Sequence, residues 1–173
     1  MTHVDTGDDE DVVNIQSIGA LMTVRTGAHN DSVRLGSLVP VSGGLLDGVS
    51  ASLLIDGEEG EDRLDVDDSG YGLPNSGQLT SSLLTGLGMS DEVNYFVEEL
   101  SIKLGTAGDS FTIEETHANR TKISMGAGDD RAAIASTSGP LHLEGELGDD
   151  TVHVATSDIN GEISADEGFL EKI

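Results

Sequence analysis

The sequence predicts an all-β fold: a right-handed parallel β-solenoid of about seven coils with ~20 residues in each. One observation is an aspartate that recurs at spacings of 20, 31, 29, 18, 21 and 20 residues. A second is the alternation of apolar and polar residues around each of these aspartates. A third is the composition, because 23 glycines with no tryptophan and no cysteine suit a repetitive stack of Val, Ile and Leu strands.

The recurring aspartates set the register of the repeat. They are Asp11, Asp31, Asp62, Asp91, Asp109, Asp130 and Asp150. Residues two and four positions after each aspartate, and seven positions before it, are apolar in all copies; around Asp130 they are Ala132, Ile134 and Ile123. A period of two is typical of a strand with one buried face. Each coil can bury that face only by stacking on its neighbours, and the general chirality preference makes the winding right-handed.

We expect one solenoid domain over residues 1–162. Two of the spacings are longer than the rest, and the extra residues fall near 38–52 and 67–85, where Gly, Pro, Asn and Ser concentrate. Both stretches therefore read as loops that leave the stack. Two interpretations of them stay open: binding loops on a rigid scaffold, or connections without a task. Residues 163–173 leave the pattern and are expected to form a cap with one helical turn, or a tail.

The charge of the chain limits its partners. Thirty-three acidic residues against eight basic ones give a formal net charge of -25, which disfavours nucleic acid and anionic membrane surfaces. The absence of cysteine excludes disulfides, thiolate metal sites and a cysteine nucleophile. No apolar run is long enough for a membrane span, and we expect no membrane insertion. Such acidity destabilises a compact chain unless cations bind or the protein works in high salt.

The chemistry that the sequence offers is oxygen ligation of calcium at Gly/Asp turns. Calcium takes six to eight oxygens from carboxylates, carbonyls and water. Glycine lets carbonyls point into the gap between stacked turns, and each aspartate adds a charge. The candidate ligands are Asp11, Asp31, Asp62, Asp109, Gly126, Gly128, Asp129, Asp130, Gly148, Asp149 and Asp150. The other interpretation is that aspartate is simply a good turn residue whose side chain bonds its own backbone.

Other site types are weakly represented. The five histidines, His3, His29, His117, His142 and His153, are scattered singly and show no zinc-site spacing. A polysaccharide-cleaving β-helix would use paired carboxylates or a basic residue, for which Arg120 and Lys122 near His117 are the candidates. A polar turn explains these residues equally well. We therefore expect no enzyme activity.

Several stretches resemble the hemolysin-type (RTX-like) calcium-binding repeat of large bacterial surface or secreted proteins. The resembling stretches are residues 64–70, 84–89, 116–118, 126–130, 136–140 and 148–150. In that family the glycine-rich nonapeptide occurs twice per coil and calcium lines both edges of a β-roll. Here it occurs once per coil, and only the Asp130 copy keeps both glycines, Gly126 and Gly128. We therefore expect an ion ladder along one edge at most.

The resemblance implies a non-enzymatic, extracellular or cell-surface module that is part of a longer protein. The expected function is structural or adhesin-like, stabilised by calcium and capable of self-assembly. The expected partners are divalent cations, neighbouring repeats of the same or the parent protein, and cell-surface glycans. The alternative is a polysaccharide-binding or polysaccharide-cleaving β-helix with its site on the two long loops. A third interpretation is that the acidity reflects adaptation to high salt.

Overall fold

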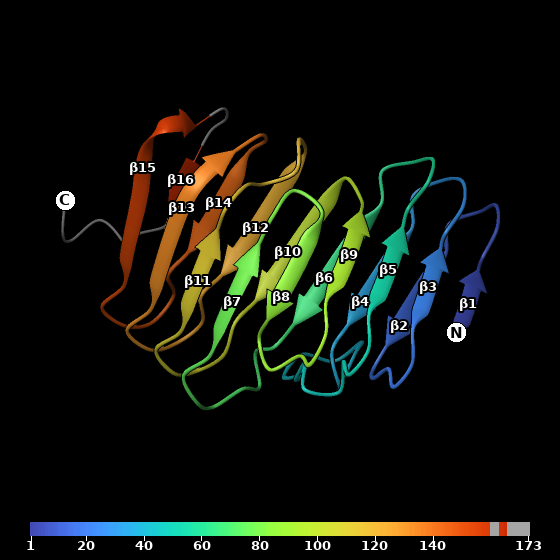
Figure 1. The fold of residues 1–173 in the computed structure, drawn as a ribbon, viewed down its shortest axis with the longest axis horizontal. Coiled ribbons are helices and arrows are strands. Elements are labelled where there is room, and N and C mark those ends of the chain that lie inside the picture. Colours follow the sequence, from blue (N-terminus) through green and yellow to red (C-terminus); the bar gives the residue numbers. More distant parts are fainter. Residues whose placement is uncertain (160–162, 166–173) are drawn as a thin grey trace.

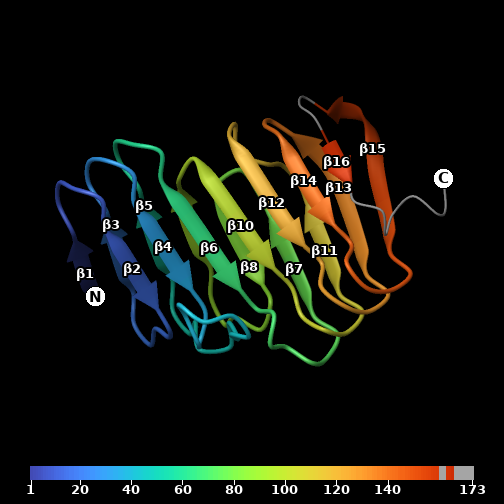
Figure 2. The ribbon, with the colours of Figure 1, turned by 180° about the vertical axis from the view of Figure 1, so that it is seen from behind.

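The computed structural model describes residues 1–159 and 163–165, and this part of the chain is all-β with no helix. Its strands form two sheets that lie face to face, one with nine strands and one with seven (Figures 1 and 2). Neighbouring strands are parallel everywhere except around one hairpin. The prediction of an all-β fold with parallel strands is confirmed.

The nine-stranded sheet follows the order β1-β3-β5-β9-β8-β7-β11-β13-β15. Its strands are β1 (Thr2–Asp5), β3 (Met22–Arg25), β5 (Leu53–Asp56), β7 (Ser76–Leu79), β8 (Leu83–Gly86), β9 (Val93–Phe96), β11 (Ser110–Ile113), β13 (Arg131–Thr137) and β15 (Thr151–Ile159). The seven-stranded sheet follows the order β16-β14-β12-β10-β6-β4-β2. Its strands are β2 (Val12–Ile15), β4 (Ser32–Leu35), β6 (Arg63–Asp67), β10 (Glu99–Lys103), β12 (Arg120–Ser124), β14 (Leu141–Glu144) and β16 (Ile163–Ala165).

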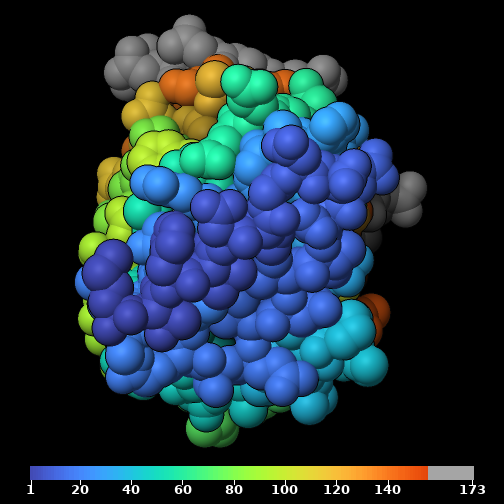
Figure 3. Space-filling view, turned by 90° about the vertical axis from the view of Figure 1, so that its right-hand side faces the viewer, coloured from blue at the N-terminus to red at the C-terminus, as the bar shows by residue number. Residues whose placement is uncertain are grey.

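The chain alternates between the two sheets as it advances along the long axis of the molecule (Figure 1). From β1 to β7, and again from β9 to β16, each strand is followed by a strand of the other sheet. The turns that lead into the seven-stranded sheet therefore line one edge of the molecule, and the turns that lead back line the opposite edge. Residues of the N-terminal repeats cover one end of the stack (Figure 3).

A hairpin interrupts this alternation in the middle of the chain. Strand β7 pairs in parallel with β11, β8 runs antiparallel to β7, and β9 runs antiparallel to β8. The expectation of a loop over residues 67–85 is therefore wrong for its second half, because residues 76–79 and 83–86 are strands of the nine-stranded sheet. The hairpin adds two strands to one sheet without adding a strand to the other.

The hydrophobic core lies between the two sheets and consists of the predicted apolar columns. Val33, Leu64, Phe111 and Ala132 hold the position two residues after the turn aspartate, and each is at most 2% exposed. The columns four residues after and seven residues before are also buried through the middle of the stack. Val154 departs from the pattern and is 39% exposed.

The first long excursion, residues 36–52, is held to the stack by two buried aspartates at the end of β6. Asp67 accepts the backbone N–H of Gly44, with a distance of 3.0 Å. Asp68 accepts the backbone N–H of Leu46 at 3.1 Å and a hydrogen bond from the Asn75 side chain at 3.1 Å. Buried polar groups need such partners, so the excursion is an anchored loop.

Two further expectations concern the end of the chain and the membrane. Residues 163–165, the start of the expected cap or tail, form the short strand β16, which pairs with β14. Residues 166–173 of the predicted cap lie outside the described residues. The described part of the chain contains no helix with the length and hydrophobicity that crossing a bilayer requires.

Candidate functional site

The predicted turn aspartates divide between the two edges of the molecule. Asp11, Asp31 and Asp62 end the turns that lead into β2, β4 and β6 of the seven-stranded sheet. Asp109, Asp130 and Asp150 end the turns that lead into β11, β13 and β15 of the nine-stranded sheet. The expectation that the turn aspartates line a single edge of the molecule is therefore wrong. The β7–β8 hairpin adds strands to one sheet only, so the recurring aspartate changes edges beyond it.

The aspartates of the first edge are joined through backbone amides, and we call this set the first ladder. The backbone N–H of Asp11 donates to Oδ1 of Asp31 at 2.7 Å, and that of Asp31 donates to Oδ1 of Asp62 at 2.8 Å. The N–H of Asp62 donates in turn to Oε2 of Glu98 at 2.9 Å. Each carboxylate therefore fixes the turn of the preceding repeat, and Glu98 ends the series.

The second ladder has the same construction on the opposite edge. The backbone N–H of Asn75 donates to Oδ1 of Asp109 at 2.8 Å. The N–H of Asp109 donates to Oδ1 of Asp130 at 2.6 Å, and that of Asp130 donates to Oδ1 of Asp150 at 2.9 Å. Hydrogen bonds to an ionised acceptor are the stronger kind, so both ladders hold neighbouring repeats in register.

The second carboxylate oxygen of most ladder aspartates is buried without a partner. Within the described residues, the atoms concerned are Oδ2 of Asp11, Asp31, Asp62, Asp130 and Asp150. Asp31, Asp62, Asp130 and Asp150 are between 2% and 6% exposed. In the second ladder, only Asp109 finds a second donor, the backbone N–H of Gly105 at 3.1 Å. A buried, unpaired carboxylate oxygen is costly, and a cation is one way to compensate it.

Five of the turns that carry the ladders, those before Asp11, Asp31, Asp62, Asp130 and Asp150, share an unusual backbone. In the Asp130 copy the two glycines have left-handed φ values, 92° for Gly126 and 126° for Gly128. Gly148 has φ 133° in the next copy. Other copies adopt this conformation without glycine, at Asp9, His29, Glu58 and Glu146. The left-handed conformation is therefore kept in copies of the turn whose glycines are replaced by other residues.

This conformation gives a first stability prediction. Glu58→Gly should raise the free energy of unfolding by about 1 kcal/mol, because Glu58 has φ 68° and L-residues are strained there by about that amount. The control is Glu59→Gly, which removes the same charge from the same exposed turn at a residue with ordinary φ. That control should be destabilising. Glu58 also lies 3.8 Å from Arg25, but such an exposed ion pair contributes little to stability. Urea denaturation of the two variants measures both effects, and equal effects would contradict the prediction.

Asp129 and Asp149, the remaining predicted ligands, lie on the outside of the second edge. Both are exposed, and Oδ1 of Asp129 accepts the backbone N–H of Asp149 at 2.9 Å. On the first edge, Asp8, Asp9 and Glu10 are likewise exposed, and Oδ1 of Asn30 accepts the backbone N–H of Glu61 at 3.0 Å. These outer groups add negative charge next to the buried ladders.

Burial raises the pKa of four ladder carboxyls. It raises the pKa of Asp62, Asp109 and Asp150, and that of Asp130 to about 6, with smaller contributions from neighbouring carboxylates at Asp62, Asp130 and Asp150. Burial also raises the pKa of Asp68 to about 7. The folded protein therefore binds these protons more tightly than the unfolded chain does.

The second prediction concerns pH. A carboxyl with a raised pKa in the folded state contributes stability below that pKa, and this is lost as the pH rises. Without divalent cations, the melting temperature should therefore fall as the pH is raised from about 4 to about 7, the window between the unfolded and folded values of Asp130 and Asp68. Asp68→Asn should flatten this slope, because asparagine does not titrate. A melting temperature that rises through this window would contradict the account.

Two ladder residues were missed by sequence reasoning, and one residue was misplaced. Glu98 and Asn75 complete the ladders, yet neither is an aspartate at the expected offset. Asp91 fits the offset, because Val93 and Tyr95 after it are buried, but its own side chain is exposed outside both ladders. Glu98 could have been found from the buried apolar residues Leu100 and Ile102, which stand two and four positions after it, as in the aspartate copies.

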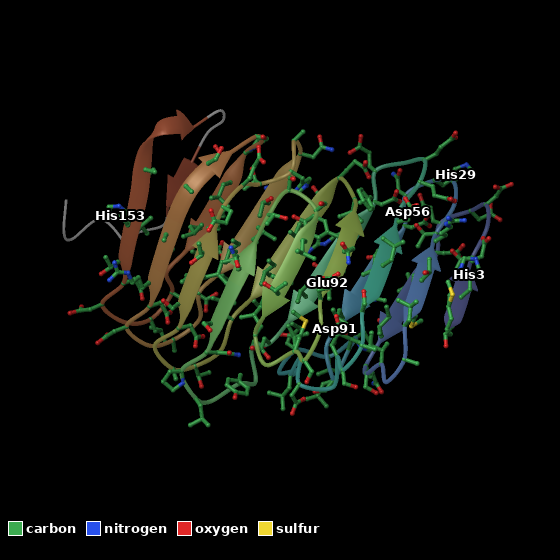
Figure 4. The ribbon with its side chains drawn as sticks, in the orientation of Figure 1. His3, His29, Asp56, Asp91, Glu92 and His153 are labelled. Carbon is green, nitrogen blue, oxygen red and sulfur yellow. The ribbon has the colours of Figure 1, made fainter. Side chains whose placement is uncertain are left out.

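The histidines do not form a site. His153 lies at one end of the molecule and His3 and His29 lie towards the other, while Asp91 and Glu92 lie at the opposite edge from His29 (Figure 4). His117 is buried with its ring edge-on to Tyr95 at 5.9 Å, and its ring nitrogens contact the Glu98 carbonyl and the Thr121 hydroxyl, both at 3.2 Å. Burial lowers the pKa of this imidazole. These contacts describe a packed core residue.

Side chains alone do not complete a metal site. Over residues 1–159 and 163–165, no three His, Asp or Glu side chains cluster closely enough to hold an ion by themselves. An ion at a ladder would need backbone carbonyls and water besides the aspartate oxygens, a ligand set that suits calcium. The ladder residues fit calcium in their chemistry, since they offer hard, anionic and unpaired oxygens beside peptide turns.

No family model, no curated protein and no solved structure matches the chain.

Proposed function

We propose that the chain is a non-enzymatic structural module, a right-handed parallel β-solenoid of about seven coils with ~20 residues in each. The alternation of strands between two parallel sheets supports this, because stacked coils produce it. The interruption at β7–β9 is then one coil that carries an additional hairpin. As a rigid rod built from repeats, the module would serve as a spacer or adhesin-like segment of an extracellular or cell-surface protein.

We further propose that calcium stabilises this rod at both aspartate ladders. The observation that carries the proposal is the row of buried Oδ2 atoms without partners, at Asp11, Asp31, Asp62, Asp130 and Asp150. These oxygens, with carbonyls of the turns around Gly126, Gly128 and Gly148, would hold the ions. Calcium would supply the positive charge that neutralises the stacked carboxylates.

The ladder geometry also gives calcium a mechanical effect. Oδ1 of each ladder aspartate is committed to the backbone of the preceding coil, so an ion held by Oδ2 would tie two turns together. The cost of an unpaired buried carboxylate oxygen is about 1–3 kcal/mol or more. Three such atoms on the first edge and two on the second would make the ion-free rod less stable than the calcium-loaded one.

A calcium-dependent melting experiment tests this proposal. The melting temperature should rise with calcium concentration, because a ligand that binds only the folded state stabilises by about 2.7 kcal/mol at a hundred times its Kd. The controls are sodium chloride and magnesium chloride at matched ionic strength. An equal rise with all three salts would sink the specific-ion proposal and favour adaptation to high salt.

A further inference from the structure

The outer face of the seven-stranded sheet gathers most of the positive charge of this acidic chain. Five of the eight basic residues lie on its adjacent strands β4, β6, β10 and β12. They are Arg34, Arg63, Lys103, Arg120 and Lys122. The other two basic residues in the described chain, Arg25 and Arg131, belong to the nine-stranded sheet. We call this group of five the basic face; the sheet that carries it lies towards the viewer in Figure 2.

The basic residues form regular rows across the strands. Arg63 and Arg120 stand on either side of Glu99 in one row, so their backbones are about 10 Å apart. The next row holds Arg34, Asp65, Ser101 and Lys122. In these rows the positive groups are therefore separated by one or two neighbouring strands that carry an acidic or hydroxyl group.

Two shallow hollows lie between these rows. One of about 150 Å³ is lined by the cations Arg34, Arg63 and Lys103, the carboxylates Asp65 and Asp67, Val66 and Ser101, together with the loop at Val39–Ser42. The other, of about 230 Å³, is lined by Arg63, Glu99, Ser101, Arg120 and Lys122. Because both hollows share Arg63 and Ser101, they lie next to each other on the sheet, and we call the pair the trough.

Several cations of the trough are available to a ligand. Arg63 is held by Asp65, with Nη2 to Oδ1 at 2.6 Å, and Lys122 is held by Glu144 at 2.7 Å. The contact between Arg120 and Glu99 is looser, at 3.7 Å, and the Arg120 side chain is 69% exposed. Among the described residues, no carboxylate lies within ion-pair distance of Arg34 or Lys103. Within the described part of the chain, the hydrogen bond that Lys103 makes is to the Ser42 hydroxyl, at 3.4 Å.

We propose that this trough binds an acidic saccharide, with its carboxylate or sulfate groups against Arg34, Lys103 and Arg120. The hydroxyls of Ser42 and Ser101 and the carboxylates of Asp65 and Glu99 would pair with the sugar hydroxyls between the anionic groups. Cations that are separated by acidic and hydroxyl groups match a chain of sugar rings that carry separated anions. The net charge of -25 does not forbid this binding, because charges beyond about 8 Å are largely screened at physiological ionic strength.

Other anionic ligands fit the trough less well. A nucleic acid strand presents a continuous row of phosphates to Asp65 and Glu99, and its bases need aromatic side chains for stacking, which the lining residues do not include. A protein partner requires a larger apolar patch than these hollows provide. An acidic peptide is the remaining competitor, and the experiment separates it from a saccharide.

The test is isothermal titration calorimetry with two probes, an oligogalacturonide and a sulfated uronic-acid oligosaccharide of the same length, in the presence of a chelator. At least one should bind, while a neutral cello-oligosaccharide and a glutamate oligopeptide should not. Arg34→Ala/Lys103→Ala should weaken the binding by about tenfold or more, since two charge-assisted contacts are lost. The matched control, Arg25→Ala/Arg131→Ala, changes the net charge equally and should retain wild-type affinity.

Four outcomes would overturn the inference: binding of neither acidic probe, equal weakening in both double variants, equally tight binding of the glutamate peptide, or binding that requires added calcium. The last would show bridging at the acidic turns. Circular dichroism verifies that both variants are folded, and neither Arg34 nor Lys103 makes an ion pair whose loss would unfold the chain. The inference does not depend on calcium at the ladders.

Discussion

Gly126→Ala is expected to destabilise the protein by about 2–5 kcal/mol, whereas Gly7→Ala should cost only about 1–2 kcal/mol. The two glycines occupy equivalent turn positions with nearly equal φ values, 92° and 89°. A Cβ on Gly126 would meet the backbone carbonyl of Gly105 in the neighbouring repeat, while a Cβ on Gly7 would meet nothing within 4 Å. The difference between the variants therefore measures how tightly consecutive turns stack.

Urea denaturation with an unchanged m-value gives this difference directly. Gly88→Ala is a second control, because Gly88 also has a left-handed φ, 78°, and its Cβ would have only distant neighbours at 3.9 Å. It lies in the middle of the chain, so it corrects for the terminal position of Gly7. Equal losses in all three variants would mean that the turns are strained individually and do not stack as the structure shows.

The second large effect is expected at Asp130. Asp130→Ala should destabilise the calcium-free protein by about 1–3 kcal/mol, because the buried N–H of Asp109 loses its acceptor. Asp130→Asn keeps an oxygen that can accept that N–H. It also removes the ionisable carboxyl group, whose pKa burial raises to about 6. The asparagine variant should therefore be clearly more stable than the alanine variant at neutral pH.

Calcium then separates the two roles of this carboxylate. Both Asp130 variants should show a smaller calcium-induced rise in melting temperature than the wild type, because each lacks the unpaired Oδ2. Asp91→Asn is the matched control, since Asp91 is exposed outside the ladders, and it should respond as the wild type does. A wild-type calcium response in Asp130→Asn would remove this aspartate from the proposed ion site.

The buried columns of the fold could be predicted from sequence because they depend on local alternation. Residues such as Ile55, Leu64 and Ile123 repeat at constant offsets from the turn aspartate, and all three are fully buried. The hairpin could not be predicted in this way. Gly77 lies against the Phe111 ring, where a larger side chain would clash. Strand β7 therefore contains a buried glycine, and in the sequence such a glycine indicates a loop.

The edge on which an aspartate lies is also hidden in the sequence. Both turns of a repeat precede a strand with the same alternation, so Asp31 and Asp130 look equivalent although they lie on opposite edges. Only the strand count between them decides the edge, and that count depends on the unpredicted hairpin. The basic face was missed for a related reason: Arg34 and Lys103 are 69 residues apart and come together only through the sheet order.

The central claim, that two aspartate ladders hold calcium between stacked coils, is tested most directly by the anomalous scattering of a crystal grown with calcium. The account predicts peaks along both edges, next to Oδ2 of Asp31 and Asp62 on one and of Asp130 and Asp150 on the other. A map without peaks at either edge, with these oxygens bonded to water or backbone amides, would contradict it.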